Sequence, residues 1–140
     1  MEETNFNENK LKHLELIQGV ITRMAGNLFY LRGWVITLVA GVLALLSQIS
    51  GDVLPFLLVI LVMVISWIYD GYFLSLERMY RDLYEKVRKL NPEKVDFSMS
   101  VEEFKKYKKN TIFFCMLSST LLFFYAPLIA SAIYLAFNAN

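Results

Sequence analysis

Few side chains in this sequence are of the types that carry out chemistry on a substrate. His13 is the one histidine, and Cys115, the one cysteine, lies about a hundred residues away. A metal site needs several ligands at matched spacing, and covalent catalysis needs a nucleophile beside a base; the sequence contains neither pattern. Because Lys12 and Glu15 flank it on a predicted helix, His13 is expected to be solvated. We therefore expect no catalytic residue, metal site or cofactor, and we predict that the protein is not an enzyme.

Two charged residues, Arg32 and Asp70, border long stretches of the chain that carry no charge. If the chain folds back on itself at Gly51, residues equally distant from Gly51 lie at the same depth, and Arg32 is then level with Asp70. Charges at the boundary of a membrane usually find partners, so we hypothesise an ion pair that clamps a hairpin. The alternative is that each charged side chain extends separately to the lipid headgroups.

Glycine recurs at every seventh residue, at Gly19, Gly26 and Gly33, in a stretch that otherwise predicts helix, and Ala40 continues the spacing. A glycine inside a helix costs about 1 kcal/mol relative to alanine, so a closely packed neighbour is expected on this face. That neighbour is either the last helix of the same chain or a helix of a second copy, with chance spacing as the remaining alternative. The opposite face carries an apolar seam at steps of three and four residues: Leu14, Ile17, Ile21, Met24, Leu28 and Leu31.

Four lysines, Lys105, Lys106, Lys108 and Lys109, directly precede the last uncharged stretch. A basic side chain near anionic lipid contributes about 1 kcal/mol of binding free energy, so the cluster is expected to lie on the lipid surface as a topology anchor. Binding of an anionic ligand such as a nucleotide second messenger is the alternative. The formal net charge of +1 argues against nucleic acid as the main partner.

The last uncharged stretch is the most polar of the three, because it contains Ser118, Ser119 and Thr120. Serine and threonine commonly return hydrogen bonds to their own helix, which is our first interpretation. The alternative is a polar face that lines a path for ions or water. Pro127 lies further along the same stretch and is expected to kink the helix.

The distribution of charge predicts the elements that hold these residues in place. The chain has 140 residues, of which 56% are hydrophobic, and its charges are clustered. Three uncharged stretches match or approach the ~20 apolar residues that cross a bilayer. The sequence therefore predicts an all-α integral membrane protein with three transmembrane helices, at residues 33–50, 53–70 and 111–137.

The first two of these helices are expected to continue beyond the membrane. Residues 1–32 are predicted to form an amphipathic cytoplasmic helix that is continuous with the first span. A short turn at Ser47–Asp52 leads to the second span, whose helical pattern runs on until Asn91 and Pro92 stop it. The two spans thus form a hairpin that extends into the cytoplasm as an antiparallel helix pair.

Residues 71–109 are predicted to form a cytoplasmic, largely helical region. Ser100 followed by Glu103 has the spacing of a capping box. A further helix is therefore expected to begin at Ser100 and to pass through the lysine cluster into the last span.

The positions of lysine and arginine predict the orientation. Ten of the 14 basic residues lie between Arg78 and Lys109, and the other four precede the first span. Because cytoplasmic loops collect basic residues, the N-terminus is expected in the cytoplasm and the C-terminus outside. The location expected for such a chain is the bacterial inner membrane.

The stretch from His13 to Trp34, HLELIQGVITRMAGNLFYLRGW, resembles the opening of a group of small, mostly uncharacterised bacterial multi-pass membrane proteins. Trp67–Tyr72 and the following Glu77 and Arg78 continue the likeness. The arrangement is also similar to the SLATT families, in which a membrane hairpin with cytoplasmic helices acts as the effector of antiphage systems. The third span departs from the two-span SLATT plan, and the resemblance supplies no catalytic or ligand residue.

Together, these features favour a small inner-membrane effector that self-associates and perturbs or permeabilises the membrane when triggered, in a bacterial defence system. Its expected partners are the lipid bilayer, further copies of the chain, and a cytoplasmic signalling protein or nucleotide. The alternative function is a non-catalytic membrane anchor or scaffold for a cytoplasmic partner.

Overall fold

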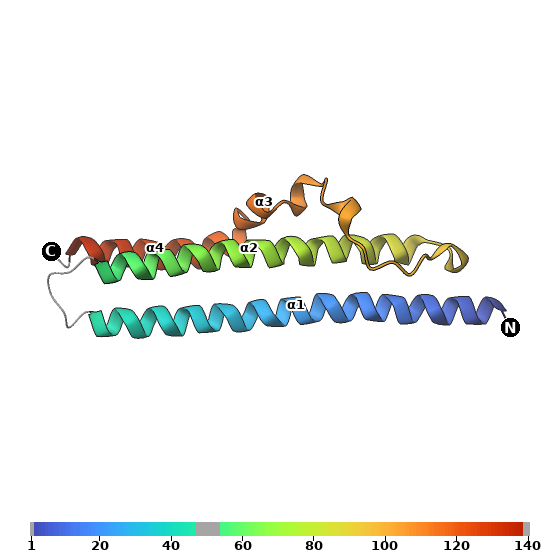
Figure 1. The fold of residues 1–140 in the computed structure, drawn as a ribbon, viewed down its shortest axis with the longest axis horizontal. Helices are drawn as coiled ribbons and strands as arrows, with labels where there is room; N and C mark the ends of the chain where they lie inside the picture. Colours follow the sequence, from blue (N-terminus) through green and yellow to red (C-terminus); the bar gives the residue numbers. More distant parts are fainter. Residues whose placement is uncertain (1, 47–53, 139–140) are drawn as a thin grey trace.

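Two long antiparallel helices run the length of the molecule in the computed structural model, which describes residues 2–46 and 54–138. They are α1 (Glu2–Leu46) and α2 (Leu54–Lys89), and they lie side by side (Figure 1). Every regular element among the described residues is a helix. The turn expected at Ser47–Asp52 lies outside those residues.

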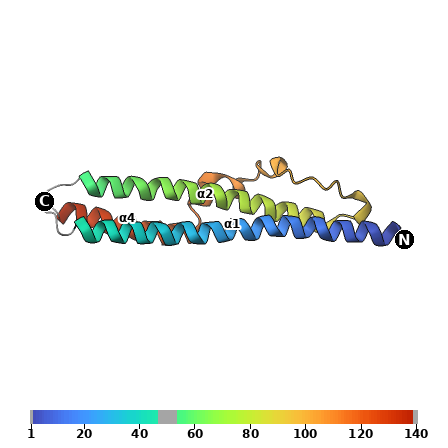
Figure 2. The same ribbon diagram turned by 60° about the horizontal axis from the view of Figure 1, so that its bottom comes forward.

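Within the described residues, three helices are long and apolar enough to cross a lipid bilayer. The stretches concerned are Asn5–Leu45 in α1, Leu54–Lys89 in α2, and Ser119–Phe137 in α4 (Ser119–Asn138). Helix α4 lies along the apolar ends of α1 and α2 (Figure 2). We call this end of the bundle, with residues 33–46 of α1 and 54–70 of α2, the apolar half, and the opposite end the polar half.

The third apolar helix is shorter than the single helix expected at 111–137, because the structure divides it into α3 (Ile112–Met116) and α4. The break falls at Leu117 and Ser118. The backbone carbonyl of Met116 lies at the end of α3 and would accept a backbone hydrogen bond in a continuous helix. Here it accepts a hydrogen bond from Trp67 Nε1 instead, at 3.0 Å. Contact with α2 thus replaces a bond that an unbroken helix would make.

The register between α1 and α2 is set at two levels. In the polar half, Lys10 donates to the carbonyl oxygens of Arg88, at 3.0 Å, and Leu90, at 2.7 Å, and so caps the end of α2. At the start of the apolar half, Arg32 bonds to Asp70. Helix α2 ends at Lys89, just before the predicted stop.

The predicted seam of α1 faces α2 and forms part of two hydrophobic clusters. In the polar half, Ile17 and Ile21 of α1 pack with Met79, Leu83 and Val87 of α2. In the apolar half all three apolar helices contribute, through Val35, Val39, Val59, Met63, Leu121, Tyr125 and Ala132. The structure thus contains one continuous seam that changes partner along its length.

The chain between α2 and α3, residues 90–111, is here called the strap. The helix expected from Ser100 onward is wrong, because this segment contains three short 3-10 turns: η1 (Pro92–Lys94), η2 (Glu102–Phe104) and η3 (Lys108–Asn110). Val95 and Phe104 of the strap are buried in the polar-half cluster. Burial of these side chains against α1 and α2 outweighs the local capping signal, as tertiary contacts commonly do.

His13 is not solvated as expected, because the strap covers it. Its side chain is 3% exposed, and its ring meets Phe97 edge to face with the centroids 5.6 Å apart. Phe97 has a φ of 54°, a conformation that bulky side chains rarely adopt. The charged residues beside His13 in the sequence give no indication of its contact with the distant Phe97.

The close approach of α3 to Gly71 of α2 leads to a testable prediction. A Cβ added there would lie 2.5 Å from Met116 Cγ and 3.5 Å from backbone atoms of Ile112 and Met116. Gly71→Leu should therefore push α3 away from α2 and lower stability by about 1–3 kcal/mol, the usual cost of overpacking. Thermal unfolding in detergent, followed by tryptophan fluorescence, measures the change.

Gly41→Leu is the matched control, because a Cβ at Gly41 meets no atom of a neighbouring element within 4 Å among the described residues. Equal losses of stability in the two variants would contradict the close packing of α3 against Gly71.

Candidate functional site at the junction of the two halves

Arg32 of α1 and Asp70 of α2 form a two-bond ion pair where the apolar half begins. Arg32 Nε donates to Asp70 Oδ2 at 2.7 Å, and Nη2 donates to Oδ1 at 2.9 Å. The Asp70 side chain has no exposed surface, whereas that of Arg32 is 24% exposed. This parallel arrangement is the strong form of an arginine–carboxylate contact. Arg32 and Asp70, which were predicted to pair because they lie equally far from Gly51 in the sequence, are therefore in contact in the structure.

Helix α4 completes the site around the same carboxylate. The hydroxyl of Tyr125 donates to Asp70 Oδ2 at 3.3 Å, and Trp67 stacks on the Tyr125 ring at 6.0 Å. The Arg32 guanidinium lies 5.9 Å from the centre of the Phe124 ring. Asp70 is therefore the point at which α1, α2 and α4 are joined by polar contacts.

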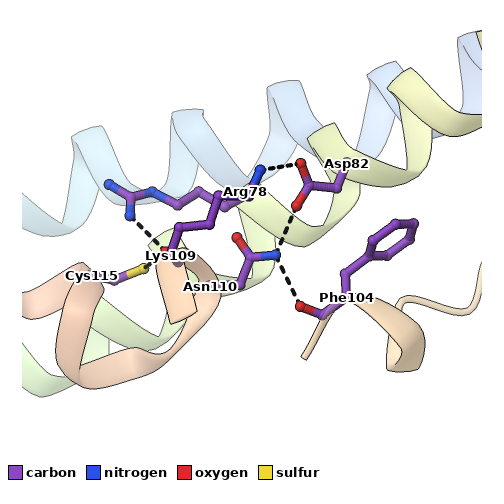
Figure 3. A network of polar contacts seen from close by, with 6 residues as sticks. All are labelled: Arg78, Asp82, Phe104, Lys109, Asn110 and Cys115. Atoms are coloured by element: carbon purple, nitrogen blue, oxygen red, sulfur yellow. Dashed lines mark hydrogen bonds and ion pairs between the residues drawn. The ribbon is translucent and has the colours of Figure 1, made fainter. Parts of the chain in front are cut away.

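A second polar network centres on Asn110, at the end of the strap (Figure 3). Its Nδ2 donates to Asp82 Oδ2 at 2.8 Å and to the carbonyl of Phe104 at 3.1 Å. Lys109 Nζ bonds to Asp82 Oδ1 at 2.6 Å. The backbone carbonyl of Asn110 accepts from the hydroxyl of Ser75. These contacts attach the strap to α2 on both sides of Asn110.

Further contacts hold the strap against the polar half. Arg78 Nη1 donates to the carbonyl of Lys109 at 2.8 Å (Figure 3). Lys86 Nζ bonds to Glu103 Oε1 at 2.6 Å, and this hydrogen bond raises the pKa of Lys86 above its ordinary value. Because Lys86 and Glu103 are exposed, their pair contributes little stability compared with the buried contacts of Asn110.

Gly19, Gly26 and Gly33, here called the glycine track, lie on a face of α1 that packs against no neighbouring element among the described residues. A Cβ added at Gly19, Gly26 or Gly33 would meet no atom of a neighbouring element within 4 Å among the described residues. Ala40 is also exposed. Packing of the chain's own last helix against this track is therefore wrong: α4 packs on the seam side of α1, where it shares the cluster of Val35 and Val39.

The four lysines of the basic cluster are all exposed on the strap. Lys105 is paired with Glu102, and Lys109 with Asp82. Lys106 Nζ lies 5.7 Å from the centre of the Tyr107 ring. Acidic partners thus neutralise part of the cluster, which weakens its attraction for an anionic surface.

The polar residues of the third apolar helix were expected either to bond to their own helix or to line a polar path, and they lie in different environments. The hydroxyl of Ser118 is buried at the break between α3 and α4 and has no hydrogen-bond partner among the described residues. Ser119, Thr120 and Pro127 are exposed. Pro127 lies within α4, which continues on both sides of it.

Sequence reasoning did not find two of the polar contacts. These are the contacts of Tyr125 with Asp70 and of Asn110 with Asp82. Because the strap separates them from Asp70 and Asp82 along the chain, no spacing rule predicts these pairs.

Among residues 2–46 and 54–138, no group of three His, Cys, Asp or Glu side chains is placed to hold a metal ion. Comparison with protein-family models, curated proteins and solved structures found no match to the chain.

The ion pair predicts unequal effects of its two single substitutions. Arg32→Leu leaves the fully buried Asp70 carboxylate without its cation, which should cost about 3–5 kcal/mol. Asp70→Leu should cost less, because Arg32 is partly exposed and can reach solvent. The double variant should recover most of the stability lost in Arg32→Leu. Unfolding by titration with a denaturing detergent gives the three free energies, and simple addition of the single effects would contradict a coupled pair.

The Asn110 network predicts that Asp82→Ala loosens the strap, since it removes partners of both Lys109 and Asn110. Trypsin should then cleave after Lys105, Lys106 or Lys108 about tenfold faster, because hydrogen bonds to a charged group contribute about 1.5–3 kcal/mol. Glu85→Ala is the matched control, since the exposed Glu85 pairs with Arg88 on the same helix and, among the described residues, with no residue of the strap. Equal cleavage of the two variants would show that Asp82 does not hold the strap.

Proposed function

We propose that the chain is a small multi-pass protein of the bacterial inner membrane, with α1, α2 and α4 crossing the bilayer. The length and composition of the three helices support this placement. The polar half and the strap are then cytoplasmic, because they carry the basic residues. The C-terminus faces the other side.

The observation that carries the functional proposal is the open glycine face of α1 in the polar half. Gly19 lies about 20 Å from Arg32 along the helix, at 1.5 Å per residue, so lipid does not cover it. Leu16, beside Gly19, is 64% exposed, and Tyr30 on the same side is 69% exposed. Glycine at this position costs helix stability, and an added Cβ would meet no neighbouring element within 4 Å in the part of the chain that the structure describes. A helix from a second copy, packed closely on this face, accounts for both features.

Self-association of this kind is suited to a membrane effector. Copies that join along α1 bring their apolar halves together, and a cytoplasmic trigger that favours the joined state would then perturb or permeabilise the bilayer. The resemblance to SLATT families points to a defence signal, either a signalling protein or a nucleotide, as the trigger.

A second candidate function is a membrane anchor or scaffold that binds a cytoplasmic protein through the paired helices. It is favoured by apolar side chains near the tip of the polar half, because Phe6 and Leu11 are 41% and 60% exposed. Induced expression separates the two functions. An effector depolarises the cells under triggering conditions, whereas an anchor leaves the membrane potential unchanged.

Gly26→Leu is the direct test of the proposed interface. The added side chain meets open space in the single chain, so the monomer should keep its fold and gain helix propensity. A second copy can no longer approach closely, and the mass of the detergent-solubilised particle should fall to that of one chain. Light scattering coupled to size exclusion measures it, and depolarisation should be lost in parallel.

Gln18→Leu is the control, since the exposed Gln18 lies about 100° around α1 from the adjacent Gly19. It should leave the particle mass unchanged. An unchanged mass for Gly26→Leu as well would eliminate the glycine face as the interface.

A further inference from the structure

A cavity of about 550 Å³ lies between α2 and the strap. One part of its wall is apolar and includes Leu76 and Met79 of α2. The other part carries polar groups of Ser75, Lys105 and Asn110. The cavity therefore suits a molecule that has both an apolar and a polar part.

The position of the cavity corresponds to the lipid headgroup layer. This step rests on the membrane placement proposed above, but not on self-association. Tyr72, which lines the cavity, follows Asp70 at the end of the second span, and Ile112 on the opposite wall begins α3. Phe113, the next residue of α3, is 73% exposed and can lie among the acyl chains.

Asn110 forms a buried part of this wall. Its side chain is 2% exposed, and its Oδ1 has no partner among the described residues. The Asp82 carboxylate and the Phe104 carbonyl only accept hydrogen bonds, so the NH₂ group must face them. The remaining oxygen has no surface open to the cavity, so Asn110 holds the wall in place and a ligand would be recognised by the exposed groups.

Lys105 and Glu102 place one charge of each sign at the cavity. Both line it, and their side chains are 57% and 73% exposed. An exposed pair of this type contributes little to stability, so a ligand can separate it at small cost. Lys105 can then bind a phosphate, while the Glu102 carboxylate accepts from an N–H or O–H donor of the ligand.

We propose that this cavity binds the headgroup of a glycerophospholipid that carries a donor beyond its phosphate. Phosphatidylethanolamine offers an ammonium group and phosphatidylglycerol offers hydroxyls, so both can donate to the Glu102 carboxylate. Phosphatidylcholine has the same phosphate but no N–H or O–H group. The bound lipid would tie the strap to the inner leaflet.

Native mass spectrometry of the full chain in detergent tests this proposal. The delipidated protein is titrated with phosphatidylethanolamine, phosphatidylglycerol and phosphatidylcholine of identical acyl chains. The first bound lipid should be about tenfold tighter for at least one donor-bearing lipid than for phosphatidylcholine. Inorganic phosphate at millimolar concentration should not displace it, whereas displacement would assign the site to free phosphate and overturn the proposal.

Two exposed substitutions keep the test independent of folding, since Asn110 itself holds the strap. Lys105→Gln should weaken the first lipid about tenfold, and Glu102→Gln should reduce the preference over phosphatidylcholine. Lys106→Gln is the matched control, because it removes the same charge from a residue that does not line the cavity. Equal binding of all three lipids, or equal effects of Lys105→Gln and Lys106→Gln, would overturn the proposal. Failure of the membrane placement is separately visible, since the chain would then stay monodisperse without detergent.

Discussion

The buried carboxylate of Asp70 is the constraint on which the arrangement of the three long helices depends. An ionised carboxylate without exposed surface is costly unless it is paired and hydrogen-bonded. Arg32 supplies the charge and two hydrogen bonds, and Tyr125 supplies a third. Any sliding of α1, α2 or α4 along its neighbours would separate one of these partners from Asp70. The hydrophobic clusters have no comparable directionality, so they add stability without selecting a register.

In the polar half, the strap is likewise held by apolar burial together with directional polar contacts. Its buried Val95 and Phe104 supply apolar contact, while Asn110 joins it to Asp82 by directional bonds. These attachments place α3 beside Gly71, where the missing side chain allows Met116 to approach. The break between α3 and α4 follows from that position, because Trp67 takes the Met116 carbonyl. The cavity lies between the strap and α2 as a result, with an acceptor of Asn110 left unused.

The two faces of α1 have different roles in this architecture. The seam side is occupied along its whole length, first by α2 and the strap and then by α2 and α4. The glycine side is open in the single chain, so the helix retains a cost in conformational entropy that contacts within the chain do not offset. This difference is the physical basis for the proposal that the glycine side serves in self-association.

Sequence alone determined the features that depend on local pattern: helical segments from periodicity, three apolar stretches from clustered charge, and the pairing of Arg32 with Asp70 from equal distances along a hairpin. Tertiary structure decided the contacts of the strap and those between the elements that the strap separates along the chain. No repeat or turn rule specifies the path of the strap. Burial of His13 beneath Phe97, the third hydrogen bond from Tyr125, the loss of the helix expected at Ser100, and the side of α1 that α4 covers all belong to this group. The reason is physical: a short turn transmits register from one helix to the next, whereas a long irregular connection leaves it to packing and buried hydrogen bonds.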